Sequence, residues 1–146
     1  NSVFYMTKQI IKPMMKARSG RIINITSAMT KSPLSPMGLS SAARTGLMSV
    51  AKGLSKDVAS SNVTINNILP ERINTDRQFG MAKLAVQFKG ITLEEAYEEM
   101  AQTIAAKRLG RPEEVGDTCA FLCSAQAGFI SGQSIHLDGG SYSGLF

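Results

Sequence analysis

The sequence predicts an α/β fold in which three parallel strands form a sheet flanked by helices. Short runs rich in β-branched residues alternate along the chain with long runs of helical periodicity. Each strand is separated from the next by far more residues than a hairpin needs, and such long crossovers join parallel strands. Their right-handed sense places helices on both faces of the sheet. No repeat, low-complexity tract or linker interrupts the 146 residues, so one α/β unit is expected.

The first half of the chain predicts helix, strand and helix. Residues 3–15 carry apolar side chains at helical spacing despite Pro13. After Ser19 and Gly20, residues 21–25 are short and rich in isoleucine, which predicts a buried strand. Residues 28–38 contain two prolines and a glycine and predict a loop. Residues 40–60 again have helical periodicity, which Asn62 ends.

The second half predicts a strand, a weakly structured region, two helices and a last strand. Residues 63–69 predict a strand closed by Pro70, and residues 71–90 predict irregular or weakly helical structure. Thr92 is the expected N-cap of a helix over 92–106. Pro112, at a first helical position, predicts a helix from there to about residue 124. Residues 134–137 predict the third strand, and residues 138–140 a turn.

Composition narrows the class of protein. With 43% hydrophobic and 18% charged residues and no run of eighteen apolar residues, the chain is expected to be globular, without a membrane span. The first eight residues lack the features of a secretory signal, so a cytoplasmic location is expected. A formal charge of +5 raises the hypothesis of nucleic-acid binding. However, the basic residues between 8 and 21 have no aromatic residues interleaved for base stacking, so a solvated face is expected.

The two cysteines and the one histidine do not predict a metal or redox site. Cys119 and Cys123 lie four residues apart, which is not the spacing of a redox Cys-x-x-Cys pair. With only His136 beside them they do not form a plausible zinc set, so no metal is expected. Packing of both cysteines in the core of a protein from a reducing compartment is the expectation.

Five segments, taken together, resemble one enzyme family. In their order and spacing they are similar to segments of the short-chain dehydrogenases/reductases, and most closely to the bacterial 3-oxoacyl carrier-protein reductase branch. The segments are GRIINITS at 20–27, VTINNILP at 63–70, INTD at 73–76, RLGRPEEV at 108–115 and ISGQSIHLDGG at 130–140. The resemblance implies that residues 1–146 are the C-terminal portion of one doubly wound, Rossmann-type domain.

The resemblance implies roles for two regions. Ser27 stands where the family places its catalytic serine, at the carboxyl end of a strand, where open α/β sheets bind ligands. The alternative for Ser27 is a strand-end hydroxyl that caps the backbone. Pro70, Glu71, Ile73 and Thr75 match the family's Pro-Gly-x-Ile-x-Thr loop, which holds the nicotinamide carboxamide. Glu71 replaces the glycine and adds bulk and charge, which we expect to weaken or reshape that site.

The catalytic positions on the next helix depart from the family. The family has a Tyr thirteen residues after its serine and a Lys four residues later, and counting from Ser27 gives Ser40 and Arg44. An aliphatic hydroxyl is far too weak an acid to replace the phenol. Arg44 keeps the positive charge and is expected to contact the nicotinamide ribose, but it does not release a proton. Among the other tyrosines, Tyr142 in the tail is the most conceivable substitute.

The function expected from this resemblance is that of an oxidoreductase which, in its full-length form, uses NAD or NADP to act on a small alcohol or carbonyl substrate. The alternative is a catalytically impaired relative with a binding or assembly role. The sequence contains no Gly-rich dinucleotide-binding turn, so the N-terminal half of the domain is expected to be absent. The strand at 21–25 would then expose an unpaired apolar edge, which we expect to be covered either by the rest of the domain or by another copy or chain. A homodimer or homotetramer is expected from the family's assemblies, and no nucleic-acid or membrane partner is expected.

Overall fold

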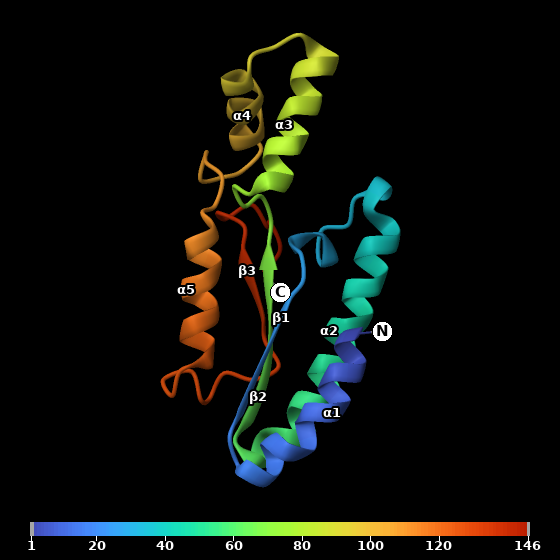
Figure 1. The fold of residues 1–146 in the computed structure, drawn as a ribbon, viewed down its shortest axis with the longest axis vertical. Coiled ribbons are helices and arrows are strands. Elements are labelled where there is room, and N and C mark those ends of the chain that lie inside the picture. The colour runs from blue at the N-terminus through green and yellow to red at the C-terminus, as the bar shows by residue number, and fades with distance from the viewer. Residues whose placement is uncertain (1, 146) are drawn as a thin grey trace.

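The computed structural model describes residues 2–145 and contains helices on both faces of a three-stranded parallel sheet (Figure 1). The elements are α1 (Ser2–Ala17), β1 (Gly20–Ile25), α2 (Gly38–Val58), β2 (Val63–Pro70), α3 (Asp76–Lys89), α4 (Leu93–Gln102), α5 (Pro112–Cys123) and β3 (Ser134–Leu137), with 3-10 turns at Ala28–Thr30, Ser35–Met37 and Ala59–Ser61. The sheet order is β1-β2-β3, and both pairings are parallel. The α/β prediction is confirmed.

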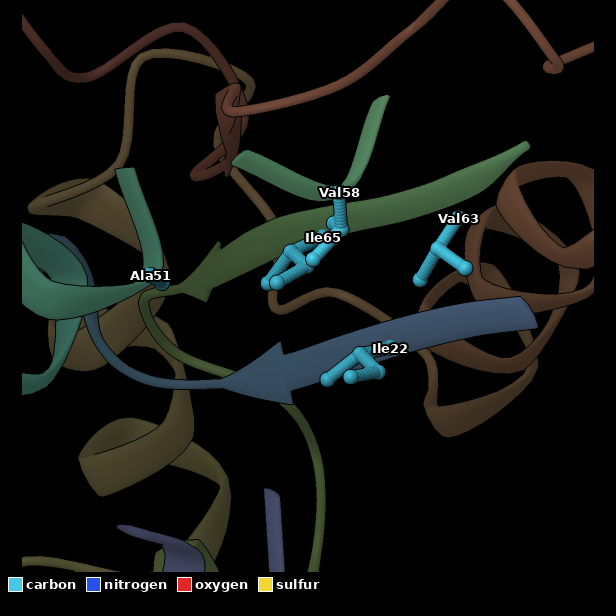
Figure 2. Packing of buried hydrophobic residues seen from close by; sticks show 5 residues of the cluster. All are labelled: Ile22, Ala51, Val58, Val63 and Ile65. Atoms are coloured by element: carbon cyan, nitrogen blue, oxygen red, sulfur yellow. The ribbon is translucent and has the colours of Figure 1, made fainter. Parts of the chain in front are cut away.

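Each face of the sheet has its own hydrophobic core. Figure 2 shows the first cluster, in which side chains of β1 and β2 meet residues of α2. Its buried members are Ile22, Ala51, Val58, Val63 and Ile65, with Ile11, Met14 and Met15 of α1 packed against them. The second cluster lies under α5 and contains Ile68, Leu122 and Ala127. Because strand side chains alternate between faces, one sheet supplies both clusters.

Buried polar side chains connect the three strands. The Asn24 amide of β1 donates to Asn67 Oδ1 of β2 at 3.1 Å, and Asn67 Nδ2 donates to Ser134 Oγ of β3 at 3.2 Å. Asn24 and Asn67 are directly opposite each other in the parallel register. Slipping a strand by one residue would leave these buried amides without partners, so the contacts favour the observed register.

Of the two alternatives for residues 71–90, irregular or weakly helical structure, the helical one is confirmed for most of the segment, because α3 is a regular helix of 14 residues. Thr75 precedes it in an extended conformation, and Asp76 lies in its first turn, where a carboxylate interacts favourably with the helix dipole. Gly90 ends it with φ +68°, and the Gly90 N–H donates to Val86 O. Its larger apolar side chains do not form one buried face, and only Gln78 and Ala82 are buried. The apolar periodicity of this segment is therefore weak, although residues typical of a helix start and a helix end are present.

The next helix is shorter than the predicted 92–106. Thr92 caps α4 as expected, accepting a hydrogen bond from Glu95 N while the Glu95 carboxylate accepts from Thr92 N. The helix ends at Gln102 because the following backbone bonds to the C-terminal turn: Ala106 N donates to Gly139 O at 3.0 Å and Ala105 N to Ser141 Oγ at 3.2 Å. Long-range hydrogen bonds thus replace the last helical turn.

The outer edge of β1 is apolar. Within residues 2–145, β1 has a hydrogen-bonded neighbour on one side only, which is β2. A hollow of about 330 Å³ lies along this edge, lined by Ile22, Ile23 and Ile25 of the strand and by Val3, Met6 and Ile10 of α1. Ile25 and Met6 are 54% and 61% exposed. No helix among the described residues is long and apolar enough to cross a membrane.

Candidate active site at the carboxyl ends of β1 and β2

One cavity of about 420 Å³ brings together every site residue that the sequence predicted. It lies where β1 and β2 end and α2 and α3 begin (Figure 1). Its lining includes Ser27, Ser40, Arg44, Pro70, Glu71, Ile73 and Thr75. These residues come from three segments up to 48 positions apart, since parallel strands deliver their carboxyl ends to one edge. The arrangement is a pocket that presents hydroxyl, guanidinium and carboxyl groups to a common space.

Ser27 caps a turn and also faces this cavity. It follows β1 in an extended conformation, with φ −168°, and its Oγ accepts a hydrogen bond from Met29 N at 3.2 Å. The capping role considered from the sequence is therefore present. A hydroxyl that accepts from the backbone still has its own proton to donate. Capping fixes the oxygen and leaves that proton available to a ligand oxygen.

Ser40 and Arg44 lie one turn apart on α2 and contact each other. The Arg44 guanidinium donates to Ser40 Oγ, and Nη1 also lies 3.4 Å from Ser40 O. Residues four apart share one face of a helix, which is why both reach the cavity. Arg44 is otherwise exposed and has further donors in its planar fork. The pair presents a fixed positive charge beside a hydroxyl that cannot titrate near neutral pH.

The loop after β2 is anchored at both ends. Glu71 N donates to Leu137 O of β3 at 3.1 Å, and Asn74 N donates to Gly110 O at 2.8 Å. Thr75 Oγ1 donates to Ile73 O at 3.3 Å, so the hydroxyl oxygen retains lone pairs. The loop therefore holds Ile73 and Thr75 against the cavity through its backbone.

Among the described residues that line the cavity, Glu71 is the one with an acidic side chain. Partial burial raises the pKa of its carboxyl group, and the negative charge of Asp138 raises it further. The Arg72 guanidinium and a hydrogen bond from Ser141 oppose this rise in pKa. Glu71 thus takes up a proton at higher pH than an ordinary glutamate does.

Several lining residues were missed by the sequence prediction. They are Thr26, Met29, Leu34, Met37, Ser41, Arg72, Arg77, Gln78 and Met81. Arg77, Gln78 and Met81 lie on the first turns of α3, in the segment that was predicted to be irregular or weakly helical. The Thr75-Asp76 start and the Lys89-Gly90 end were the signals that would have revealed this helix and its contribution to the cavity.

Tyr142, the tyrosine considered as a substitute for the family's phenol, makes ring contacts with residues outside the cavity lining. Tyr142 stacks on His136, with ring centroids 4.4 Å apart and planes inclined by 12°, and Lys31 Nζ is 5.6 Å from the centroid of its ring. Tyr142 is not one of the described residues that line the cavity. Its position therefore gives no support to the substitution of Tyr142 for the family's phenol.

The cysteines differ from each other in environment. Cys119 packs against the second cluster, and burial together with the neighbouring Cys123 raises the pKa of its thiol. Cys123 is exposed, so the expectation of core packing is wrong for it: Leu122 takes the buried position at the end of α5. Within residues 2–145, no group of three or more His, Cys, Asp or Glu residues is placed to hold a metal ion.

Comparisons with known proteins agree with this geometry. The family profile described as enoyl-(acyl carrier protein) reductase matches residues 1–142. The chain is 34% identical over 141 residues to the 3-oxoacyl-[acyl-carrier-protein] reductase FabG of Vibrio cholerae, covering 97% of this chain and 53% of that protein. It is 35% identical over 142 residues to FabG of Escherichia coli K12, covering 97% and 54%. The chain thus spans about half the length of the curated relatives it matches.

Solved structures give the same result. YwfH, an NADPH-dependent reductase involved in bacilysin biosynthesis, superposes with a TM-score of 0.87 at 33% identity, over 95% of this chain and 53% of that one. L-sorbose reductase from Gluconobacter frateurii, complexed with NADPH and L-sorbose, gives a TM-score of 0.91 at 26% identity, over 98% and 55%. With its parallel sheet, its serine at the end of β1 and its matched profile, this chain belongs to the short-chain dehydrogenase/reductase family.

Proposed function

We propose that this chain carries the substrate side of an oxidoreductase that, in its full-length form, uses NAD or NADP to interconvert a small alcohol and its carbonyl compound. The observation that supports this most is the single cavity around which Ser27, Ser40, Arg44 and the loop of residues 70–75 converge. Such a cavity at the carboxyl ends of parallel strands is the usual ligand site of an open α/β sheet.

The lining fits the nicotinamide end of such a cofactor. The free donors of the Arg44 guanidinium suit the ribose hydroxyls, and the backbone of Ile73 with the Thr75 hydroxyl suits the carboxamide, which both donates and accepts hydrogen bonds. Glu71, bulkier than the family's glycine, narrows this end of the cavity and gives it an additional acceptor. When bound, the reduced cofactor supplies the hydride for the carbonyl carbon.

The carbonyl oxygen must gain a proton during reduction, and Glu71 is the lining residue suited to supply it. Ser40 is too weak an acid, and arginines do not deprotonate. Glu71 lines the same cavity as Ser27, and its raised pKa increases the fraction that carries a proton. In this assignment Ser27 donates a hydrogen bond that orients the substrate oxygen, and Glu71 transfers the proton.

The remaining lining indicates the kind of substrate. Met29, Leu34, Met37 and Met81 provide apolar surface, and Leu34 is 56% exposed without a ligand. Arg77 adds a guanidinium at the start of α3. A carbonyl compound with an apolar portion and a polar or anionic end would satisfy both kinds of surface.

The replacement of Tyr and Lys by Ser40 and Arg44 favours one alternative, a non-catalytic relative that retains the fold for binding or assembly. The two functions differ in one assay. Full-length protein would be tested for hydride transfer beside a Ser40→Tyr/Arg44→Lys double variant, by nicotinamide absorbance with a panel of carbonyl compounds. Unaltered protein is expected to turn over slowly, and the double variant roughly 10²–10⁴ times faster.

One control variant and one binding measurement complete the test. Ser27→Ala in the double-variant background should remove most of the gain, because the substrate oxygen loses its donor. Activity that appears only in the double variant would favour the binding role. If the unaltered protein does not bind NADH or NADPH in a fluorescence titration, the proposed oxidoreductase function is refuted.

The exposed edge of β1 bears on the full-length protein and its assembly. We include in the proposal that this edge is covered by further strands of the same domain, and that the protein forms a homodimer or homotetramer. The apolar hollow along β1 and the relatives of twice the length support the first point. Light scattering would give the oligomeric mass, and a purified band near 15.6 kDa would exclude additional strands in the same polypeptide.

A further inference from the structure

Two residues of the loop that carries Ile73 and Thr75 line a second cavity as well as the candidate active site. The second cavity, of about 270 Å³, is lined among others by Arg108, Glu114 and His136. Arg72 and Ile73 line both cavities. Residues that border open space on two cavities are less confined by packing than core residues, so specific contacts contribute to fixing their position.

Gly110 makes the contacts that position Ile73 and its neighbours in the loop. Gly110 N donates to Arg72 O at 2.9 Å, and Asn74 N donates to Gly110 O at 2.8 Å, which forms an isolated parallel bridge between Ile73 and Gly110. A Cβ atom added at Gly110 would lie 2.6 Å from Ile73 Cδ1. The backbone of Gly110 therefore fixes the position of the loop backbone. Its close approach to Ile73 Cδ1 also limits where the Ile73 side chain can lie.

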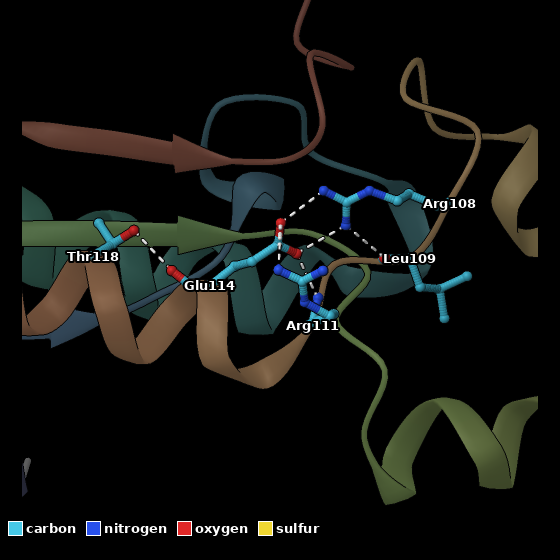
Figure 3. A network of polar contacts seen from close by, with 5 residues as sticks. All are labelled: Arg108, Leu109, Arg111, Glu114 and Thr118. Atoms are coloured by element: carbon cyan, nitrogen blue, oxygen red, sulfur yellow. Dashed lines mark hydrogen bonds and ion pairs between the residues drawn. The ribbon is translucent and has the colours of Figure 1, made fainter.

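Figure 3 shows the Glu114 carboxylate bonded to Arg108 and Arg111, the residues on either side of the Leu109-Gly110 segment. The Arg108 guanidinium donates to both carboxylate oxygens, at 2.8 Å and 2.7 Å, and Arg111 N donates to Oε2 at 2.7 Å. These bonds hold the pKa of Glu114 down at about 2. Arg108 and Arg111 flank the Leu109-Gly110 segment, so one carboxylate ties both sides of Gly110 to the first turn of α5.

We propose that Glu114, with Arg108, is a positioning residue for the nicotinamide side of the site: the carboxylate holds Gly110, and Gly110 holds Ile73 and Thr75 where the cofactor's nicotinamide end binds. This inference rests on the proposed function. It assigns to a pair outside the candidate active site an effect on one end of the cofactor. Loss of the Glu114–Arg108 pair lets the loop shift toward the cavity of about 270 Å³.

The test compares two ligands on full-length protein. NADPH and NADH have the nicotinamide end, whereas ADP-ribose and its 2′-phosphate lack it. Glu114→Gln keeps the shape and an acceptor for Arg111 N but loses the ionic bidentate pair with Arg108. The matched control is Glu113→Gln, the same change at an exposed neighbour in the same helical turn. Dissociation constants would be measured by fluorescence and calorimetry, with near-ultraviolet circular dichroism to confirm folding.

Glu114→Gln should raise the Kd of the reduced cofactor at least about tenfold, since small displacements of positioning groups have large effects, and change the Kd of the ADP-ribose ligand less than about twofold. Glu113→Gln should change neither. Arg108→Lys, which keeps the charge but not the fork, should show the same selective loss and serves if the first variant does not fold. Gly110→Ala, which displaces Ile73 directly, should do so too.

The possible failures are distinguishable. If unaltered protein binds the reduced cofactor and Glu114→Gln binds it equally well, the inference is refuted and the proposed function stands. Equal weakening of both ligands would also refute the inference, because it would indicate a general loss of structure. If unaltered protein binds no reduced cofactor, the proposed function fails, and the inference fails with it.

Discussion

Asn66 and Thr64 should respond in opposite ways to the same change. Both lie on β2, two residues apart on one face, and they are 0% and 3% exposed. Asn66 Nδ2 donates to Ile130 O at 2.8 Å, and Asn66 Oδ1 accepts from Gln133 N at 3.0 Å. Thr64 Oγ1 is buried without a hydrogen-bond partner among the described residues. Valine at each position therefore tests buried hydrogen bonds against an unsatisfied hydroxyl.

The two bonds at Asn66 give the magnitude. Asn66→Val removes the side-chain partners of the partly buried Ile130 carbonyl and Gln133 N–H, at up to about 1–3 kcal/mol each, for a total of about 2–6 kcal/mol. Burial of valine methyl groups instead of an amide returns about 1–2 kcal/mol. The expected loss in free energy of unfolding is about 0–5 kcal/mol, with a midpoint of about 2.5 kcal/mol. Thr64→Val replaces an unsatisfied hydroxyl by a methyl group of similar size and should leave stability unchanged or raise it by about 1 kcal/mol.

Urea unfolding of the two variants and unaltered protein would measure these differences, provided that the m-values agree. Asn66 holds the segment that leads into β3, and β3 accepts the hydrogen bond from Glu71 N. A variant Asn66→Val as stable as Thr64→Val would refute the reasoning that these two side-chain bonds fix that segment.

Four further outcomes are expected. Leu122→Ala, at a fully buried position, should lower the free energy of unfolding by about 2–5 kcal/mol in urea denaturation. Gly132→Ala should lower it by about 2–4 kcal/mol, because φ is +69° and the new Cβ would lie 2.5 Å from Ser55 Oγ. The pKa of Glu71 is raised in the folded state, so its ionisation costs stability as pH rises through that folded-state pKa. The Tm of Glu71→Gln should therefore equal that of unaltered protein below the ordinary pKa of 4.5 and exceed it near pH 7. Ser27→Ala should cost only about 1 kcal/mol of stability through loss of the Met29 cap but lower the rate of hydride transfer about 10²–10³-fold in steady-state assays.

The strands could be predicted from local patterns and the candidate site residues from the family resemblance, whereas contacts distant in sequence could not be predicted. The third strand was predicted at its observed bounds, because a short β-branched run before Asp-Gly-Gly is a local signal. The end of α4 was not, since Ala106 N bonds to Gly139 O, 33 residues away. Helix α3 was predicted only as an alternative to irregular structure, because its apolar residues lack a single buried face, and Arg77 was not predicted as a site residue. The role of Gly110 behind Ile73 depends on a backbone bridge that leaves no pattern in the sequence.

The departures that the family resemblance implies all lie on residues that line the cavity. Ser40 and Arg44 are in direct contact with each other. Ser27 and Thr75, which the resemblance assigns to substrate and cofactor, remain. Glu71, where the resemblance places a glycine, is the one acidic residue among the described residues of this lining, and partial burial raises the pKa of its carboxyl group. The proposed function assigns the proton transfer to this acid in place of a phenol, whereas the alternative of a binding role assigns no task to an acid at this position.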